Sequence, residues 1–554
     1  MGVGHAYAIA LQGSEGKVVT VECDVCRGLP GISVVGMGDA AVVQAKDRIR
    51  SALRNTGVQW PGSRTVMSLS PAAMPKSGSG YDVAMVCAML LASGATGVTE
   101  AVRERVHSAV LVGELGLDGS VRPVPGIFPR VAAAAAHGFR HVVVPEACAE
   151  EARRAVELLN DEPSPGPEAG RAGQLGQPGQ LGQFGQPRQP MVHLASHLGQ
   201  VLDWMHGGQL PRPVPGQALP PGGAPGDMSD MSDMSDVVGQ SEAVHAVEVA
   251  AAGGHNLMLT GPPGSGKSML AERLPGILPP MTRREQREAA VVHSIAGTKG
   301  DLSAIWRGTR PFVAPHHSIT HAAMIGGGAI PVPGAVSLAH HGVLFIDEVA
   351  EARREVLDSL RTPLEKRRVE IIRQRQIMTF PAQFQLVLAA NPCPCGAELA
   401  SECRCPSGAR RRYQGKISGP LRDRIDVFAR TRSVNKSASA SSRAEASSII
   451  AERVCAARDR ALQRWARVSR ELGGERDFLN STIPSTILRD DFAPDGNGTT
   501  ALGGLVMSRE LSQRGADRAL RVAWTLADLA GADRPGLDHV LDAVDLFRDG
   551  TELD

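Results

Sequence analysis

The sequence has no long hydrophobic run and no excess of charge of either sign. A membrane-spanning helix needs about 20 consecutive apolar residues, and no segment reaches that length. The first residues, MGVGHAYAIALQGSEGK, lack the charged, apolar and small-residue order of a secretory signal peptide. The 59 Lys and Arg residues balance 58 Asp and Glu residues, for a net charge of +1. We therefore expect a cytoplasmic protein, with no membrane partner, that holds any anionic partner through a local patch.

Cysteine is also scarce. Nine cysteines in 554 residues, an odd number with four of them close together, do not resemble the disulfide framework of a small secreted protein. Reduced thiols or one metal site fit better. Cys23 and Cys26 form a lone CxxC in a predicted strand, where positions i and i+3 point to opposite faces, which argues against joint metal binding.

The length predicts three or four domains. Residues 159–226 are rich in Gly, Pro and Gln, so we expect a flexible linker there, interrupted by one short amphipathic helix within 191–208. The linker separates an N-terminal domain, 1–158, from an α/β domain at 227–435. Helical periodicity after that point predicts a helical C-terminal domain, 436–554.

A phosphate-binding loop is the strongest signal in the sequence. In HNLMLTGPPGSGKSMLAERL an apolar strand runs into GxxxxGK[ST], and a helix follows. Glycines let backbone N–H groups close around phosphate oxygens, while the lysine reaches the terminal phosphates and the serine hydroxyl ligates Mg²⁺. The predicted ATP-binding residues are Gly261, Pro262, Pro263, Gly264, Ser265, Gly266, Lys267 and Ser268.

Two further apolar runs end in polar residues. GVLFIDE ends in Asp347, predicted to hold Mg²⁺ together with Ser268, and in Glu348, predicted to polarise the attacking water. FQLVLAAN ends at Asn391, which could orient that water or sense the terminal phosphate. In a parallel sheet, ligands bind at the carboxyl ends of the strands, so these residues should form one site.

The order of these segments is that of the AAA+ ATPases, and several blocks are more specific. RPFVAPHHSITHAAMIGGG, SLAHHGVLFIDE, FPAQFQLVLAANPCPCG and SGPLRDRID resemble the magnesium-chelatase-like AAA+ ATPases of the YifB/ComM family. The resemblance covers nearly the whole chain outside the linker. It implies an ATPase with a parallel-sheet P-loop domain and a helical lid. The sequence departs from the family pattern at Ala335, where relatives commonly have Glu, and at Trp524, where they usually have Arg.

The resemblance also implies two catalytic arginines. Arg424 in DRID, with Arg422 as the alternative, matches the arginine finger that completes a neighbouring subunit's site. Arg514 in LSQRG matches the second sensor arginine of the lid. Both roles place a fixed cation against developing phosphate charge. A finger that acts in trans requires a ring, so a homo-hexamer is the expectation.

The N-terminal domain resembles the proteolytic domain of Lon, but both catalytic residues differ. Gly80 in PKSGSGYDVAM falls where Lon has its serine, and Arg130 falls where Lon has its lysine. An arginine stays protonated and cannot activate a serine such as Ser77 or Ser79 nearby. We expect an α+β protease-like fold without protease activity, which leaves recruitment of a protein partner as an open role.

A basic hairpin is predicted in LEKRRVEIIRQRQIMTFPAQ, with VEII and QIMTF as its strands. Arg373 and Arg375 lie at its tip, and Lys366, Arg367 and Arg368 lie at its base. In related ring ATPases a hairpin at this place enters the central pore, where a positive channel would bind single-stranded or branched DNA. A solvated basic face is the alternative.

The resemblance also suggests DNA, because ComM-type members are regarded as branch-migration motors in the uptake of transforming DNA. Two other functions compete with a DNA motor. One is a chelatase-type motor for metal insertion into a tetrapyrrole, and the other is a nucleotide-gated scaffold that hydrolyses ATP slowly. The intact Glu348 argues against the scaffold.

Two groups of residues suggest metal ligands. Cys393, Cys395, Cys403 and Cys405 supply four soft ligands, enough for one tetrahedral Zn²⁺; reduced structural thiols and a redox switch are the alternatives. His316, His317 and His321 have no accompanying carboxylate in their loop-like segment, so a structural or pore-loop role is expected for them.

Overall fold

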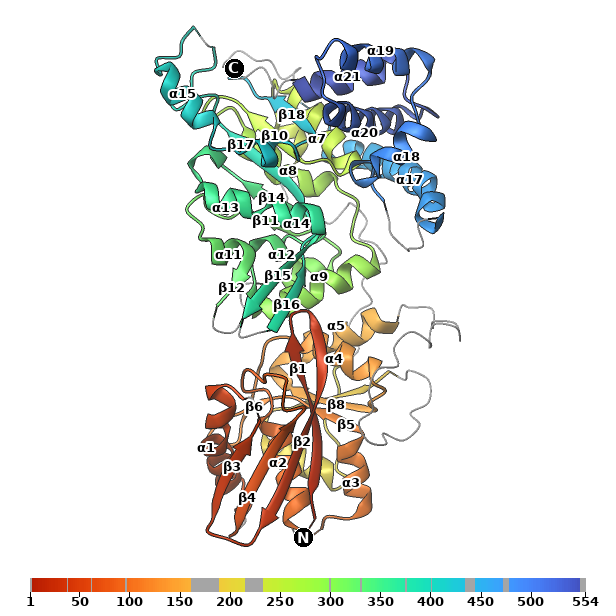
Figure 1. Ribbon diagram of the computed structural model, residues 1–554. Coiled ribbons are helices and arrows are strands. Elements are labelled where there is room, and N and C mark those ends of the chain that lie inside the picture. The colour runs from red at the N-terminus through yellow and green to blue at the C-terminus, as the bar shows by residue number, and fades with distance from the viewer. Residues whose placement is uncertain are drawn as a thin grey trace.

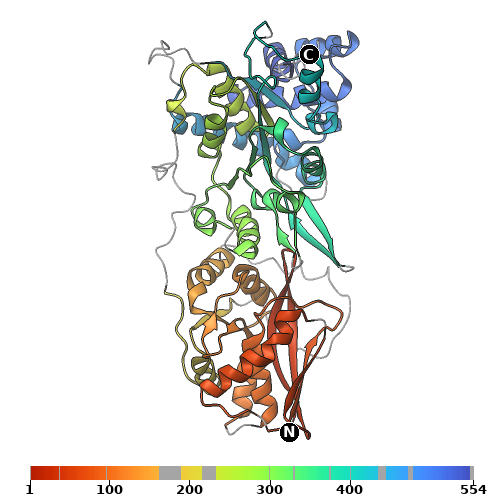
Figure 2. The ribbon, with the colours of Figure 1, turned by 90° about the vertical axis from the view of Figure 1, so that its left-hand side faces the viewer.

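The computed structural model of the chain is elongated, with one sheet domain at each end of its long axis (Figures 1 and 2). No helix in the described part of the chain is long and apolar enough to cross a membrane. The described residues are 2–36, 38–60, 62–94, 97–160, 189–214, 233–297, 300–328, 331–373, 376–399, 401–433, 444–471 and 478–548.

A seven-stranded mixed sheet forms the centre of the N-terminal domain. Its strands are β1 (Gly4–Gln12), β2 (Glu15–Cys26), β3 (Gly31–Val35), β4 (Arg64–Ser70), β5 (Ala109–Leu111), β8 (His141–Pro145) and β9 (Met191–Ala195). They lie in the order β3-β4-β2-β1-β5-β8-β9, and a separate small ladder joins β6 (Glu114–Leu115) to β7 (Val121–Arg122). Along β1, Ala6 and Ala8 belong to the core on one face while Tyr7 and Ile9 belong to the core on the other. Helices therefore cover both faces.

The helices of this domain divide between the two faces of the sheet. One face packs against α1 (Ala40–Asn55), α2 (Asp82–Ser93), α3 (Glu100–His107) and α6 (Leu198–Met205). The other face packs against α4 (Ile127–Ala136) and α5 (Ala149–Asn160). These elements confirm the predicted mixture of helix and strand in the N-terminal domain.

The prediction of one helix within residues 191–208 was wrong for the first part of that segment. Met191–Ala195 form β9, which pairs in parallel with β8, and α6 begins only at Leu198. Pairing with β8 satisfies backbone groups on one side of Met191–Ala195, and this outweighs the helical spacing of the apolar residues. The N-terminal sheet therefore continues to residue 195. Most of the rest of the predicted linker lies outside the described residues.

A five-stranded parallel sheet forms the centre of the second domain, as predicted. Its strands are β10 (Leu257–Thr260), β11 (Phe312–Val313), β14 (Val343–Ile346), β17 (Gln385–Ala390) and β18 (Val427–Arg430). They lie in the order β11-β14-β17-β10-β18, and every neighbouring pair is parallel. All residues of β10, β14 and β17 are buried, and apart from Thr260 and Gln385 they are apolar.

The helices around this sheet again form two layers. One layer contains α7 (Ser241–Gly253) and α8 (Lys267–Ile277). The other layer consists of short elements, among them α11 (His321–Ile325), α12 (Ala335–Leu338) and α13 (Arg354–Ser359). A small hairpin of β12 (Gly326–Gly327) and β13 (Val332–Pro333) lies between α11 and α12 in the sequence. The remaining helices of the domain are α9 (Arg283–Ala296), α10 (Leu302–Trp306), α14 (Arg361–Lys366), α15 (Ser407–Gln414) and α16 (Gly419–Arg422).

The predicted basic hairpin is present as β15 (Arg368–Arg373) and β16 (Gln376–Pro381). Val369, Ile371 and Phe380 anchor its base in the core. Ile372 and Ile377 pair across the two strands near the tip, where they are 69% and 56% exposed.

The C-terminal domain is helical, as predicted. It contains α17 (Ser447–Glu471), α18 (Ser485–Asp490), α19 (Gly496–Met507), α20 (Gln513–Ala530) and α21 (Leu537–Arg548). Helices α17 and α20 pack on the α7 and α8 side of the parallel sheet. Trp524 is buried against Trp465 and Phe492 and is part of the lid core.

The two sheet domains are in direct contact (Figure 1). Helix α4 packs on α9, the Phe128 and Trp306 rings lie 5.9 Å apart, and the Gly126 N–H donates to the Ser294 carbonyl at 3.0 Å. At the turn after β1, the Ser14 N–H donates to the Thr379 carbonyl of β16 at 3.2 Å. The N-terminal domain thus touches the basic hairpin.

Candidate nucleotide site

The phosphate loop connects β10 to α8, in the strand, loop and helix context that the sequence predicts. Gly264 and Gly266 have φ angles of 76° and 89°, a backbone region that L-residues rarely adopt. A Cβ atom at either position would meet nothing within 4 Å. The requirement for glycine here is therefore conformational, and it turns the loop's backbone towards the space that phosphates would fill.

Lys267 is held by protein oxygens at the start of α8. Its ammonium group donates to the carbonyls of Gly261 and Pro262 at 2.7 and 2.9 Å, and to Asn391 Oδ1 at 3.1 Å. Burial lowers the pKa of Lys267, and the nearby carboxylates of Asp347 and Glu348 oppose this shift. The lysine is thus fixed between the loop and the predicted sensor at the end of β17.

The hydroxyl and the carboxylate predicted to bind Mg²⁺ lie side by side. Ser268 Oγ donates to Asp347 Oδ2 at 2.6 Å, and the Glu348 N–H donates to Asp347 Oδ1 at 2.8 Å. A hydroxyl oxygen and a carboxylate oxygen at this separation are hard ligands that suit Mg²⁺, with water and phosphate oxygens as the other ligands.

Glu348 follows β14 in an unusual backbone conformation. Its φ angle is 47°, in the left-handed region that non-glycine residues seldom occupy. Such strain persists where the surrounding structure requires a particular side-chain direction, and it is frequent at functional sites. This conformation places the Glu348 side chain, which is 55% exposed, beside His317.

His317 is a site residue that the sequence analysis did not assign. Its Nδ1 lies 3.3 Å from Glu348 Oε2. The neighbouring His316 hydrogen-bonds to Ser318 Oγ at 2.7 Å, and His321 begins α11. The expectation that these histidines do not form a metal site stays a prediction, but one of them belongs to the nucleotide site. His317 could be recognised as a site residue only from its contact with Glu348, which lies in another loop.

The two predicted catalytic arginines lie elsewhere. Because β10 and β18 are parallel, the phosphate loop follows the carboxyl end of β10, whereas Arg424 precedes the amino end of β18. Asn256, just before β10, donates to the Arg424 carbonyl at 2.7 Å. Arg424 therefore lies at the opposite edge of the sheet from the loop of its own chain.

Arg514 lies near Arg424 in the cleft between the sheet and the lid. Its Nη1 is 3.8 Å from Asp423 Oδ2, and Arg424 forms an ion pair with Glu365. Both arginines line a cavity of about 730 Å³, and no residue of the phosphate loop lines it. The structure brings these two arginines together but not to the phosphate loop of the same chain.

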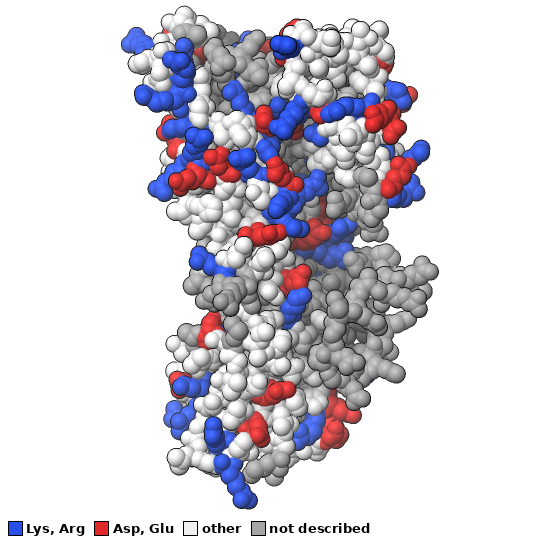
Figure 3. All heavy atoms as spheres, in the orientation of Figure 1, with Lys and Arg blue, Asp and Glu red and all other residues white. Residues whose placement is uncertain are grey.

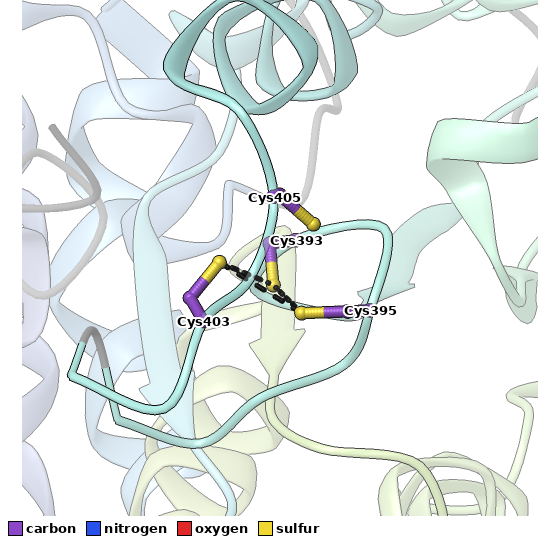
Figure 4. Close-up of side chains that lie close together, drawn as sticks. All are labelled: Cys393, Cys395, Cys403 and Cys405. Carbon is purple, nitrogen blue, oxygen red and sulfur yellow. Dashed lines mark hydrogen bonds between the residues drawn. The ribbon is translucent and has the colours of Figure 1, made fainter.

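The four cysteines form one cluster in the loop after β17 (Figure 4). The Sγ atoms of Cys393, Cys395 and Cys403 are 3.3, 3.8 and 3.5 Å apart in pairs, and that of Cys405 lies within 4.8 Å of them. All four are free thiols. The Ala397 backbone N–H foremost, and then the Cys393 thiol, lower the pKa of Cys395 to about 6 by hydrogen bonding.

A second group, Glu288, His340 and His341, also has ligand atoms within 4.8 Å of one another. The Gln383 N–H donates to His340 Nδ1 at 3.1 Å, so the neutral ring has its proton on Nε2 and no lone pair there for a metal. His340 Nε2 instead lies 3.4 Å from Glu288 Oε2. We interpret this group as a polar contact between α9 and the segment before β14.

In the N-terminal domain, the positions that correspond to Lon's catalytic residues lie side by side. A Cβ atom built on Gly80 would lie 3.6 Å from Arg130 Nη2. Arg130 is buried, and it donates to the carbonyls of Ile9 and Gly126, each at 3.1 Å. Ser79, the nearby hydroxyl, donates to Glu114. Gly80 and Arg130, which the sequence analysis aligns with Lon's serine and lysine, are thus neighbours in the fold.

At the hairpin, the structure describes only one of the two predicted DNA-binding arginines. Arg373 is exposed at the end of β15, and Arg375 lies outside the described residues. The exposed Ile372–Ile377 pair beside Arg373 is a second feature that the sequence analysis did not assign.

Family models match most of the chain. Residues 233–439 match the model "Magnesium chelatase, subunit ChlI", residues 21–148 match "Subunit ChlI of Mg-chelatase", and residues 444–547 match "Magnesium chelatase, subunit ChlI C-terminal". Each match falls on one of the three folded parts described above.

Full-length relatives are similar from end to end. An uncharacterized protein of Mycobacterium tuberculosis is 42% identical over 99% of both chains. Protein YifB of Escherichia coli is 34% identical, and competence protein ComM of Haemophilus influenzae is 32% identical, each over 98% of this chain and 97% of the relative. A local similarity to Lon protease of Desulfovibrio desulfuricans, 31% identical, covers 26% of this chain and 16% of that protease.

Proposed function

Because this chain belongs to the YifB and ComM family of magnesium-chelatase-like AAA+ ATPases, we propose that it is an ATP-driven ring motor that acts on DNA. The observation that carries the ATPase part is the convergence of Lys267, Ser268, Asp347, Glu348 and Asn391 at one edge of the parallel sheet. Three strand ends contribute to this site, each with the residue type that nucleotide hydrolysis requires.

Each residue has a distinct task in hydrolysis. The loop backbone and Lys267 bind the phosphates, and Ser268 and Asp347 would hold Mg²⁺, which supplies charge neutralisation when bound. Glu348 polarises the attacking water, with His317 orienting its carboxylate. Asn391 already contacts Lys267, so it is placed to report whether a terminal phosphate has displaced that contact.

The two arginines complete the site of a neighbouring subunit in this proposal. Arg424 lies at the sheet edge opposite its own phosphate loop, and Arg514 lines the same cleft. A neighbour whose phosphate loop faces this cleft would receive both cations, and repetition of that contact closes a ring. A homo-hexamer is the assembly proposed.

The proposed substrate is single-stranded or branched DNA, bound by the hairpin β15–β16. The hairpin presents the exposed Arg373 and, at its base, the exposed Lys366 and Arg368. Elsewhere, basic and acidic side chains are interspersed on the face shown in Figure 3, and the net charge is only +1. Local binding by a ring of hairpins therefore fits better than attraction by the molecule as a whole. The similarity to competence protein ComM supports DNA as the substrate.

The decisive experiment is ATP hydrolysis by the full chain, measured with a panel of DNA structures at low salt. Single-stranded or forked DNA should raise turnover, and replacing Arg373 and Arg375 with Ala should abolish the stimulation while basal turnover remains. Exchanging Arg467 and Arg470, which are exposed on α17, for Ala serves as the matched control. The absence of any DNA effect at low salt would refute the DNA motor.

Three further assignments belong to this proposal. The protein works in the cytoplasm. The N-terminal domain is not a protease, since Gly80 provides no nucleophile and Arg130 no base, and it recruits a protein partner instead. Zn²⁺ at the four cysteines is a structural cofactor, because four protein ligands leave no open position for chemistry.

A further inference from the structure

We infer that the four cysteines form a closed zinc site whose ion holds the segment from Asn391 to Gly396 against the phosphate loop, so that zinc occupancy sets the affinity for nucleotide. The inference rests on the ATP-binding part of the proposed function and is independent of DNA. The segment from Asn391 to Gly396 connects the cysteine cluster to the phosphate loop.

The geometry of the cluster fits zinc. Zinc–thiolate bonds of about 2.3 Å place the sulfur atoms of a tetrahedral site about 3.8 Å apart. The separations of 3.3, 3.5 and 3.8 Å among three of the Sγ atoms are close to that spacing, and the fourth lies within 4.8 Å. The Sγ atoms come from both ends of the loop: those of Cys393, Cys395 and Cys403 point toward one another, and Cys405 lies beside them (Figure 4).

The loop contacts the phosphate-binding residues on both sides of its first two cysteines. On one side, Asn391 Oδ1 accepts from Lys267 at 3.1 Å. On the other side, a turn closed by the Gly396 N–H and the Cys393 carbonyl at 3.0 Å brings Gly396 onto Pro263 of the phosphate loop. Cys393 and Cys395 lie between these contacts, so an ion that fixes them fixes both.

Gly396 shows how tight the second contact is. A Cβ atom there would lie 2.5 Å from Pro263 Cδ, and the φ angle of 72° itself disfavours any side chain. Zinc would also join this segment to α15, which follows Cys405 and whose Tyr413 lines a small cavity with Asn391. The ion would thus hold together a loop in which few residues other than Cys393 and Gly396 are buried.

The first test is the metal content of the full chain, purified without chelators from zinc-supplemented cells. We expect one zinc ion per chain in the native protein and in Cys455→Ser, whose cysteine lies on α17 outside the cluster. Cys403→Ser should lose most of it. Cobalt added in place of zinc should give the absorption of a tetrahedral thiolate site. A native protein without zinc that also fails to take up cobalt would overturn the metal site, and this result does not depend on variant folding.

The second test separates the coupling from the metal. Gly396→Ala should keep its zinc but bind a fluorescent ATP analogue about tenfold more weakly, whereas Gly408→Ala, where a Cβ atom meets nothing within 4 Å, should bind normally. Zinc removal from the native protein should weaken ATP binding to a similar extent. Unchanged binding after zinc loss would overturn the coupling. A native chain that holds zinc but never binds ATP would instead refute the proposed function.

Discussion

In the proposed mechanism, Glu348 is the residue on which hydrolysis depends most. Its exposed carboxylate is set by a positive φ angle and lies 3.3 Å from His317. We expect Glu348→Gln to bind ATP normally and to hydrolyse it about 10²- to 10⁴-fold more slowly, since general-base catalysis typically contributes that factor. Nucleotide binding and phosphate release, measured on the same sample, check this prediction.

Glu351→Gln is the matched control for that substitution. Glu351 lies three residues further on, is exposed, and pairs with Lys416 at 3.4 Å. Its loss should leave turnover unchanged, because exposed ion pairs contribute little. Normal turnover in Glu348→Gln would show that another group polarises the water.

His340 gives the stability of the fold a pH dependence. Burial lowers its pKa to about 4; Glu288 opposes this shift and His341 adds to it. The unfolded chain, with a histidine pKa of about 6.5, then takes up a proton that the folded chain does not. The contribution of His340 to the free energy of unfolding should be fully present above a pH of about 6.5. It should fall by up to about 3 kcal/mol as the pH is lowered to 4.

Urea unfolding between pH 7 and pH 4.5 measures this contribution. In His340→Gln the acid-induced decrease should be smaller than in the native chain, whereas His245→Gln, an exposed residue of α7, should reproduce the native slope. Equal slopes in all three proteins would contradict the assignment of a buried neutral His340.

Among the elements, the hairpin β15–β16 has an unusual tip. Ile372 and Ile377 face each other across the strands with no cover, next to Arg373. Under the DNA proposal these side chains pack against bases, and burial of such a side chain is worth about 1.5–3 kcal/mol. Ile372→Ser with Ile377→Ser should therefore weaken DNA binding about tenfold or more and leave basal ATP turnover unchanged.

Fluorescence anisotropy with labelled single-stranded DNA measures this effect. Met507→Ser removes a comparable apolar side chain, 85% exposed on α19, and should bind DNA like the native chain. Unaltered binding by the double isoleucine variant would limit the role of the hairpin to its arginines.

Elements with local signals could be predicted from the sequence. β10, β14 and β17 are almost entirely apolar because they are buried on both faces. The phosphate loop has a glycine spacing that its backbone conformation requires. β9 was not predicted, because its strand character depends on pairing with β8, far away in the sequence. His317 was missed for the same reason, since its contact with Glu348 joins two loops.

At the scale of the whole molecule, the proposed ring can be tested by mixing two inactive chains. Glu348→Gln lacks its own water-polarising residue but keeps Arg424, and Arg424→Ala has the reverse defect. An interface that combines the intact half of each variant should hydrolyse ATP. The mixture is therefore expected to exceed both separate proteins, reaching up to about a quarter of the native rate when the chains mix randomly in equal amounts.

The control for complementation is a mixture of Glu348→Gln with a chain carrying both Glu348→Gln and Arg424→Ala, in which no interface has an intact phosphate site. It should stay inactive. Failure of the first mixture, with both chains shown to be in the same particle, would place the action of Arg424 within its own chain.

The separation of Arg424 from the phosphate loop, at opposite edges of the parallel sheet, has a consequence for assembly. In the proposed assembly, each chain offers one half of a catalytic centre on each side, so an isolated chain would contain no complete centre. An open row of n such chains would contain n − 1 complete catalytic centres. Closing the row into a ring would form the remaining centre. Specific activity should thus fall on dilution as rings dissociate. A chain that carries both Glu348→Gln and Arg424→Ala should silence the two boundaries that it shares.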